Sequence, residues 1–104
     1  MNQVIFNEIR ALKRQLLPND RMILFGSQAR GDAREDSDWD LLVLLSKSTG
    51  SFKEDFDRYG YPFIECGMNN NEDVNIYLYS MDEWETYKDR SMFYHNVNRE
   101  GIEI

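Results

Sequence analysis

The sequence has a single cysteine, Cys66, so no disulfide can form within the chain. This excludes a disulfide-stabilised secreted domain and fits the reducing cytoplasm. No apolar run approaches the roughly 20 residues that a membrane-spanning helix needs. The first residues, Met1–Val4, also lack the basic and apolar regions of a signal peptide. We therefore expect a cytoplasmic protein that does not contact a membrane.

Basic residues are also scarce, since 12 lysines and arginines stand against 19 acidic residues and give a formal net charge of −7. A protein that binds nucleic acid through the phosphate backbone needs a basic surface. We therefore expect no nucleic-acid partner. With 104 residues the chain has the length of one domain with one modest core, and we expect a single domain over residues 1–104.

What the sequence does contain is an unusual stretch between Gly26 and Leu45. An apolar run, Met22–Phe25, stops abruptly at Gly26, as a buried strand does when it turns. A short polar segment follows until Gly31, acidic residues crowd the segment Asp32–Asp40, and a second apolar run begins. The pattern predicts a strand over Arg21–Phe25, a glycine turn, a short helix, an acidic loop and a second strand over Asp40–Leu45 that is covered on both faces.

The chemistry of this stretch suits a phosphate-rich ligand and a cation. Gly26 allows a ligand to approach the backbone closely, and Ser27 adds a hydroxyl beside the free amide groups of the following helix. Asp38 and Asp40 are two residues apart, so both carboxylates leave the same face of an extended chain. Two converging carboxylates suit Mg²⁺, whose remaining ligands would be water and triphosphate oxygens.

Simpler interpretations of the same residues exist. The spacing of Gly26 and Gly31 superficially matches a phosphate-binding P-loop, but Asp32 stands where that motif requires lysine, which excludes it. A glycine–serine pair alone is more often only a turn, and Asp38 and Asp40 alone would be solvated acids. Their order between two apolar strands favours the functional interpretation.

The remaining elements follow from periodicity and capping signals. The spacing predicts an amphipathic helix over Val4–Leu17, a helix over Phe52–Glu65 with Pro62 disturbing its end, and a half-exposed strand over Val74–Tyr79. Ser80 and Glu83 form a capping-box pattern for a helix that carries Trp84 and Tyr87. A last helix is expected over Ser91–Arg99, closed by Gly101, and loops over Ser46–Ser51 and Gly67–Glu72.

Two linked motifs resemble the signature of the DNA polymerase beta-like nucleotidyltransferases, in their minimal nucleotidyltransferase branch. These motifs are Gly26-Ser27-x-Ala29-Arg30-Gly31 and Ser37-Asp38-x-Asp40-Leu41. A weaker likeness continues through Tyr79–Trp84 and Arg99–Ile102. The resemblance implies a mixed α/β (α+β) fold with a small twisted mixed sheet flanked by helices.

The resemblance also implies an activity, the transfer of a nucleoside monophosphate such as AMP from a triphosphate to a hydroxyl acceptor. Gly26, Ser27 and Arg30 would bind the nucleotide, ATP in the first instance, while Asp38 and Asp40 would be catalytic and carry Mg²⁺. Small members of this branch are often antitoxins that modify a HEPN-domain toxin, which makes such a protein a candidate partner.

One position departs from the pattern of the family, which usually has a third carboxylate on a neighbouring strand. Asn75 falls on that position, and Asp73 lies two residues earlier on the same face. Either Asp73 substitutes for it or the third carboxylate is absent. A missing general base typically costs about 10²–10⁴ in rate. Three functions therefore stay open: a protein-modifying enzyme, an enzyme for a small molecule similar to the aminoglycoside nucleotidyltransferases, and a non-catalytic antitoxin-like binding protein.

Overall fold

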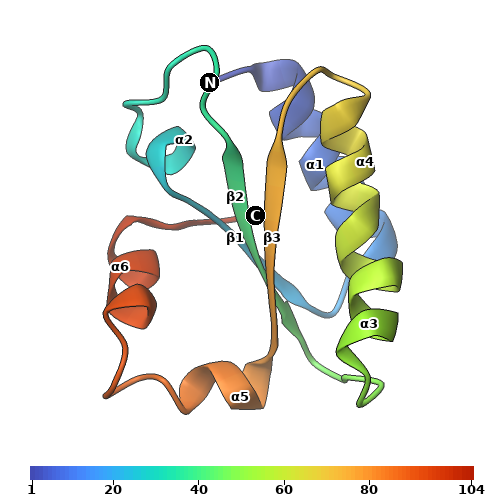
Figure 1. Ribbon diagram of the computed structural model, residues 1–104, viewed down its shortest axis with the longest axis vertical. Helices are drawn as coiled ribbons and strands as arrows, with labels where there is room; N and C mark the ends of the chain where they lie inside the picture. Colours follow the sequence, from blue (N-terminus) through green and yellow to red (C-terminus); the bar gives the residue numbers. More distant parts are fainter.

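The chain forms six α-helices, one π-helical turn and four strands in the computed structural model, which describes residues 1–104 (Figure 1). The N-terminal elements are α1 (Gln3–Leu16), β1 (Arg21–Phe25), α2 (Ser27–Arg30) and β2 (Trp39–Leu45). The central elements are α3 (Phe52–Asp55), η1 (Phe56–Gly60), α4 (Tyr61–Met68) and β3 (Val74–Ser80). The C-terminal elements are α5 (Met81–Glu85), α6 (Met92–Glu100) and β4 (Ile102–Glu103).

The four strands form one sheet in the order β3-β2-β1-β4. Strands β2 and β3 run parallel, whereas β1 is antiparallel to both β2 and β4, so the sheet is mixed. Strand β2 lies inside the sheet and is apolar at every position except Asp40. Its alternate residues enter two different clusters, with Leu41 and Val43 on one face and Leu42 and Leu44 on the other. The predicted mixed α+β fold, with its small sheet flanked by helices, is confirmed.

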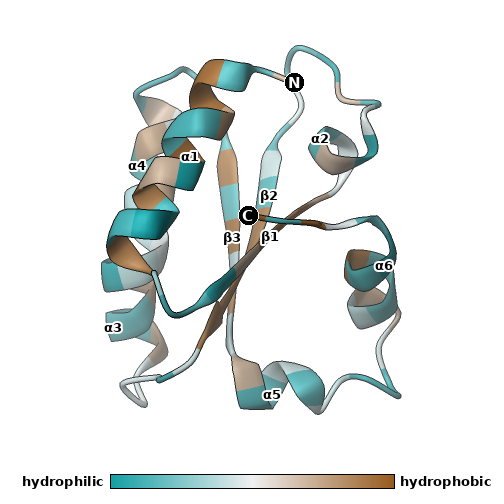
Figure 2. Cartoon of the chain, turned by 180° about the vertical axis from the view of Figure 1, so that it is seen from behind, coloured by the Kyte–Doolittle hydropathy of each residue, from teal (hydrophilic) through white to brown (hydrophobic).

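Helices cover both faces of the sheet (Figure 1). Helices α1, α3 and α4 lie on one side, where Ile9 and Phe63 belong with Trp39 to one buried cluster. Helices α5 and α6 lie on the other, where Trp84 and Val97 are buried. Figure 2 shows hydrophilic and hydrophobic residues alternating along α1, as expected of an amphipathic helix with one buried face.

The structure corrects the prediction for the helix that follows β2. In the structure α3, η1 and α4 follow one another without a break and end at Met68 rather than near Glu65. Pro62 lies in the first turn of α4 and does not disturb the end of the helix. A π turn over Phe56–Gly60 immediately precedes this proline, and the Tyr61 N–H donates to the carbonyl of Phe56. The wider turn displaces the backbone from regular α geometry, where the proline ring would clash with the preceding turn.

The C-terminal part also differs in detail from the prediction. Helix α5 begins at the Ser80 cap, whose hydroxyl accepts from the Glu83 N–H, but it ends at Glu85, before Tyr87. Gly101 ends α6 with an ordinary φ of −72° rather than a left-handed turn. A glycine is needed there because a Cβ would lie 2.5 Å from Ile23 Cγ2 and from the Val97 carbonyl oxygen. Strand β4, which the sequence did not predict, follows directly and pairs with β1.

Asp55 anchors the loop after β2, and its removal should weaken the fold in a pH-dependent way. Its buried carboxylate accepts from the Ser48 hydroxyl at 2.6 Å and the Thr49 N–H at 3.1 Å. Burial alone would raise the pKa of Asp55, but these hydrogen bonds outweigh it and hold the pKa below its ordinary value.

The stability that Asp55 contributes is therefore present above its unfolded pKa of about 3.9 and lost as the pH falls through the lower folded pKa. We expect Asp55→Asn to lower the free energy of unfolding by about 1–3 kcal/mol at pH 7, with a smaller loss at pH 3. Urea unfolding at both pH values measures the difference. Asp57→Asn, which breaks only a surface pair with Lys53, serves as the control, and an equal loss at both pH values would contradict the account.

None of the helices combines the length and the apolar character that crossing a bilayer requires.

Candidate functional site

The turn between β1 and α2 depends on Gly26. Its φ of 77° and ψ of −158° lie in a region that only glycine occupies readily. A Cβ on Gly26 would also lie 2.5 Å from Asp40 Oδ2. The sequence suggested that a ligand approaches this backbone closely, but the group that does so in the structure is the carboxylate of Asp40. The following helix, α2, is a single turn that ends at Gly31, and the predicted short helix is thereby confirmed.

Asp38 and Asp40 are brought together with Asn75. Strand pairing places Asp40 beside Phe25 of β1 on one side and Asn75 of β3 on the other. The side-chain nitrogen of Asn75, Nδ2, donates to Asp38 Oδ2 and to Asp40 Oδ1, each at 3.1 Å. Both carboxylates therefore point to the same place, as their spacing in the sequence predicts, and an amide group lies where they meet.

Asp73, the other candidate for the third carboxylate, has a different position. It precedes β3, and its backbone carbonyl accepts from the Trp39 N–H at 2.8 Å, which starts the pairing of β3 with β2. No group of three or more acidic, histidine or cysteine side chains is close enough to hold a metal ion. The structure thus places Asn75, and not a third acid, beside Asp38 and Asp40.

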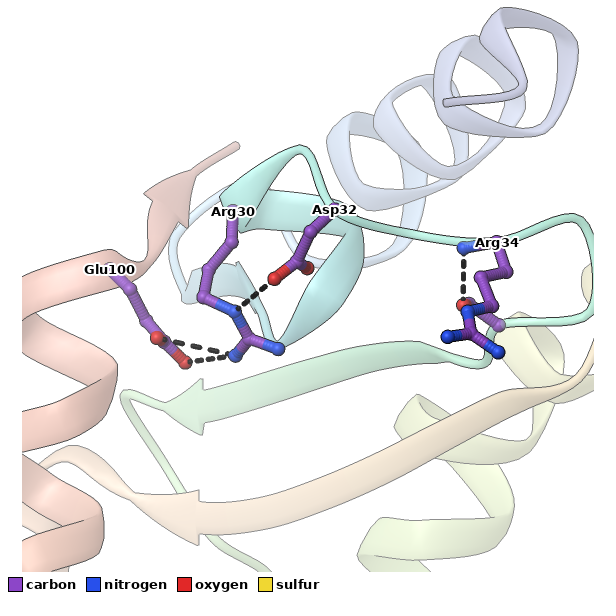
Figure 3. A network of polar contacts seen from close by, with 5 residues as sticks. Arg30, Asp32, Arg34 and Glu100 are labelled. Carbon is purple, nitrogen blue, oxygen red and sulfur yellow. Dashed lines mark hydrogen bonds and ion pairs between the residues drawn. The ribbon is translucent and has the colours of Figure 1, made fainter.

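Arg30 makes ion pairs on the protein itself (Figure 3). Its Nε lies 3.3 Å from Asp32 Oδ2, and its Nη1 lies 3.3 Å from Glu100 Oε1 on α6. Hydrogen bonds to Asp32 and then to Glu100 raise the pKa of the guanidinium. These contacts use Nε and Nη1 and leave Nη2 of the guanidinium without a partner on the protein. Glu100 is 70 residues away along the chain, and no local signal in the sequence points to it.

Two further contacts hold the acidic loop before Asp38. The buried side chain of Gln28 donates from Nε2 to the Ser37 carbonyl at 3.2 Å. The backbone N–H of Arg34 donates to the Ser37 hydroxyl at 2.7 Å (Figure 3). These bonds fix the residue that precedes Asp38. Gln28 lies within the motif that defines the site, yet sequence reasoning gave it no role.

An aromatic group adjoins the acids. Tyr77 follows Asn75 by two residues on β3, so both side chains lie on the same face. Its ring contacts Phe25 edge-on at 5.2 Å between centroids and Phe93 of α6 at 5.6 Å. Burial first, and then the charges of Asp40 and Asp38, raise the pKa of the Tyr77 hydroxyl. Tyr77 therefore lies close enough to the two acids to be affected by their charge.

The site is open to the surface. Asp38 is exposed and Asp40 half-buried, and none of the cavities of the molecule is lined by Asp38, Asp40 or Asn75. An enclosed pocket for a small acceptor is thus not formed around the acids by this chain alone.

A glycine–serine turn at the end of one strand, facing two aspartates at the start of the next, is the arrangement that defines nucleotidyltransferases. The chain belongs to that class: it is a member of the nucleotidyltransferase domain family, which it matches over residues 7–92. The resemblance to the polymerase beta-like superfamily is thereby confirmed. Most of α6 and all of β4 lie beyond the matched residues.

The fold is similar to a chain in a crystal structure of a toxin–antitoxin with AMP-PNP. The TM-score is 0.63 with 20% identity, and the alignment covers 99% of this chain and 72% of that chain. At this identity the likeness establishes the fold and nothing further. A comparison with curated protein sequences gave no significant match.

We expect Gly26→Ala to destabilise the protein and to displace Asp40 at the same time. The backbone region alone costs about 1–3 kcal/mol for a non-glycine residue, and the new Cβ would collide with the carboxylate. Gly31→Ala is the matched control, because Gly31 also has a positive φ, of 84°, but has no atom within 4 Å of its would-be Cβ. Thermal melting of both variants compares the two effects, and a smaller loss for Gly26→Ala than for Gly31→Ala would contradict this account.

Proposed function

We propose that this chain binds a nucleoside triphosphate with Mg²⁺ at Asp38 and Asp40 and transfers the nucleoside monophosphate, AMP in the first instance, to a hydroxyl acceptor. The observation that carries the proposal is the convergence of the two aspartates at the Gly26 turn, with a single hydrogen-bond donor reaching both. Membership of the nucleotidyltransferase domain family supports the same reaction.

The residues present fit a magnesium ion that is shared with the substrate. Mg²⁺ in phosphate-transfer sites is usually held by one or two carboxylates together with phosphate oxygens and water, and Asp38 and Asp40 supply those two carboxylates. When bound, the ion would neutralise charge on the phosphates and stabilise the departing pyrophosphate.

The remaining roles belong to the protein. The Ser27 hydroxyl and the backbone at Gly26 would donate hydrogen bonds to triphosphate oxygens. Arg30 would add positive charge through Nη2, which its pairs with Asp32 and Glu100 do not use. The acceptor oxygen forms the new bond to the α-phosphorus, the bond from that phosphorus to the bridging oxygen breaks, and pyrophosphate leaves. The hydroxyl proton passes to solvent, because the amide of Asn75 cannot accept it as a carboxylate would.

We further propose that the acceptor is a hydroxyl on a partner protein, a toxin of the HEPN type, in the cytoplasm. The open surface around the acids suits an acceptor presented by another macromolecule, because this chain forms no cavity there for a small molecule such as an aminoglycoside. The net charge of −7 disfavours nucleic acid. The similar fold in a toxin–antitoxin structure supports a toxin as partner.

A second candidate function is favoured by Asn75. If the amide beside the two aspartates leaves turnover too slow to matter, the chain would bind nucleotide and neutralise its partner by contact alone. Incubating the chain with ATP labelled at the α-phosphate and a co-expressed HEPN-type toxin separates the two functions. Label on the toxin supports transfer. An inhibited but unlabelled toxin supports the binding protein, and a toxin that is neither labelled nor inhibited contradicts both.

A further inference from the structure

Asn75 stabilises the side-by-side carboxylates of Asp38 and Asp40, as a bound cation would in part. Two carboxylates that point to one place repel each other. The amide group of Asn75 carries two N–H bonds, and in the structure its nitrogen donates to one oxygen of each acid. Hydrogen bonds to a charged acceptor are stronger than neutral ones, so this contact stabilises the converged pair.

The amide nitrogen and a metal ion cannot serve both acids at the same time. Asn75 Nδ2 lies 3.1 Å from each carboxylate oxygen, whereas Mg²⁺ binds oxygen at about 2.1 Å. An ion held by both acids would draw them closer to a common centre, and the N–H groups would have to withdraw from it. Asn75 sits on β3 opposite Asp40 in the strand pairing, so its backbone cannot move away without disturbing the sheet.

The free energy gained by binding Mg²⁺ in the absence of nucleotide is therefore small. The ion must lose part of its tightly held water and displace two charge-assisted hydrogen bonds, and it gains only two carboxylates in return. A bound triphosphate makes Mg²⁺ binding more favourable, since it offers several anionic oxygens as further ligands to the same ion.

We propose that Asn75 makes magnesium binding conditional on nucleotide, so that the protein takes up the metal and the triphosphate together and not the metal alone. The inference rests on the proposed function. Because binding coupling is reciprocal, the triphosphate raises the affinity for Mg²⁺ by the same factor as Mg²⁺ raises the affinity for the triphosphate.

The test is calorimetric titration with Mg²⁺ alone, and then with Mg²⁺ in the presence of a saturating non-hydrolysable ATP analogue. For the wild-type protein we expect at least about tenfold weaker Mg²⁺ binding without the analogue, within the usual range of coupling. Asn75→Ala removes the competing amide without adding a ligand, and it should bind Mg²⁺ alone about tenfold more tightly than the wild type. Asn75→Asp adds a third carboxylate and should bind it more tightly still.

Asn19→Asp is the control for added negative charge, because Asn19 is exposed and precedes β1 at the end opposite Gly26. Its affinity for Mg²⁺ without nucleotide should equal that of the wild type. If Asn75→Ala destabilises the fold, Asn75→Asp still reports the conditional binding, since Mg²⁺ should also raise its melting temperature without nucleotide.

The inference is overturned if neither Asn75 variant binds Mg²⁺ alone more tightly than the wild type, or if the wild type binds Mg²⁺ equally with and without the analogue. The first result leaves magnesium-dependent analogue binding, and so the proposed function, intact. The second also contradicts the proposed function, because the coupling between two ligands is reciprocal. A wild-type protein that does not bind the analogue in Mg²⁺ contradicts the proposed function itself, and the conditional binding with it.

Discussion

Replacing Asp38 and Asp40 together by asparagine should abolish the magnesium-dependent part of nucleotide binding and lower nucleotidyl transfer by about a thousandfold or more. The reason is that this pair supplies both protein carboxylates that converge at the site, while no third acid is available to replace them. Metal assistance in phosphate chemistry contributes several kcal/mol to transition-state stabilisation, and each 1.4 kcal/mol corresponds to about tenfold in rate.

The double variant should keep its fold, because Asp38 is exposed, Asp40 is half-buried, and an asparagine carbonyl oxygen can still accept from Asn75. The matched control is Asp36→Asn, which removes one charge from the same acidic loop at an exposed position. Calorimetry and label transfer on both variants provide the comparison. Magnesium-dependent binding that persists in the double variant would show that the metal is held elsewhere.

Asn75→Asp should increase transfer by about a hundredfold, the lower end of what a general base contributes. The strand register places position 75 directly opposite Asp40, so a carboxylate there would complete the acidic group and could also accept the proton of the attacking hydroxyl. Initial rates of label transfer to the same acceptor measure the effect in both proteins.

Asp73→Asn is the companion variant, and we expect it to change transfer little. Asp73 lies before β3 and joins no acidic group with Asp38 and Asp40. The opposite pattern, in which Asp73→Asn abolishes transfer and Asn75→Asp brings no gain, would identify Asp73 as the working carboxylate.

The sequence predicts the part of the fold that local patterns determine. The strand β1 has the predicted ends, β2 begins one residue earlier than predicted, and α2 lies between Gly26 and Gly31 as expected. These elements follow from apolar runs, amphipathic spacing and glycine breaks, all of which act over a few residues. The convergence of Asp38 and Asp40 was predictable for the same reason, since it needs only their spacing on an extended chain.

What the sequence could not predict depends on contacts between distant segments. Strand β4 has only two residues and exists because it pairs with Ile23 and Leu24. The ion pair between Arg30 and Glu100 joins α2 to the end of α6. The sequence placed Asn75 correctly in a strand, but only the pairing of β3 with β2 shows that its amide reaches both acids.

The central claim is that Asp38, Asp40 and the Gly26 turn form a nucleotide site that requires magnesium. The most direct measurement is a calorimetric titration of the wild-type protein with a non-hydrolysable ATP analogue, once in excess Mg²⁺ and once with all divalent metal chelated. The account predicts saturable binding in Mg²⁺ and an affinity at least about tenfold lower in chelator, in the usual range of coupling between two ligands. No binding in Mg²⁺, or equal affinity under both conditions, would contradict it.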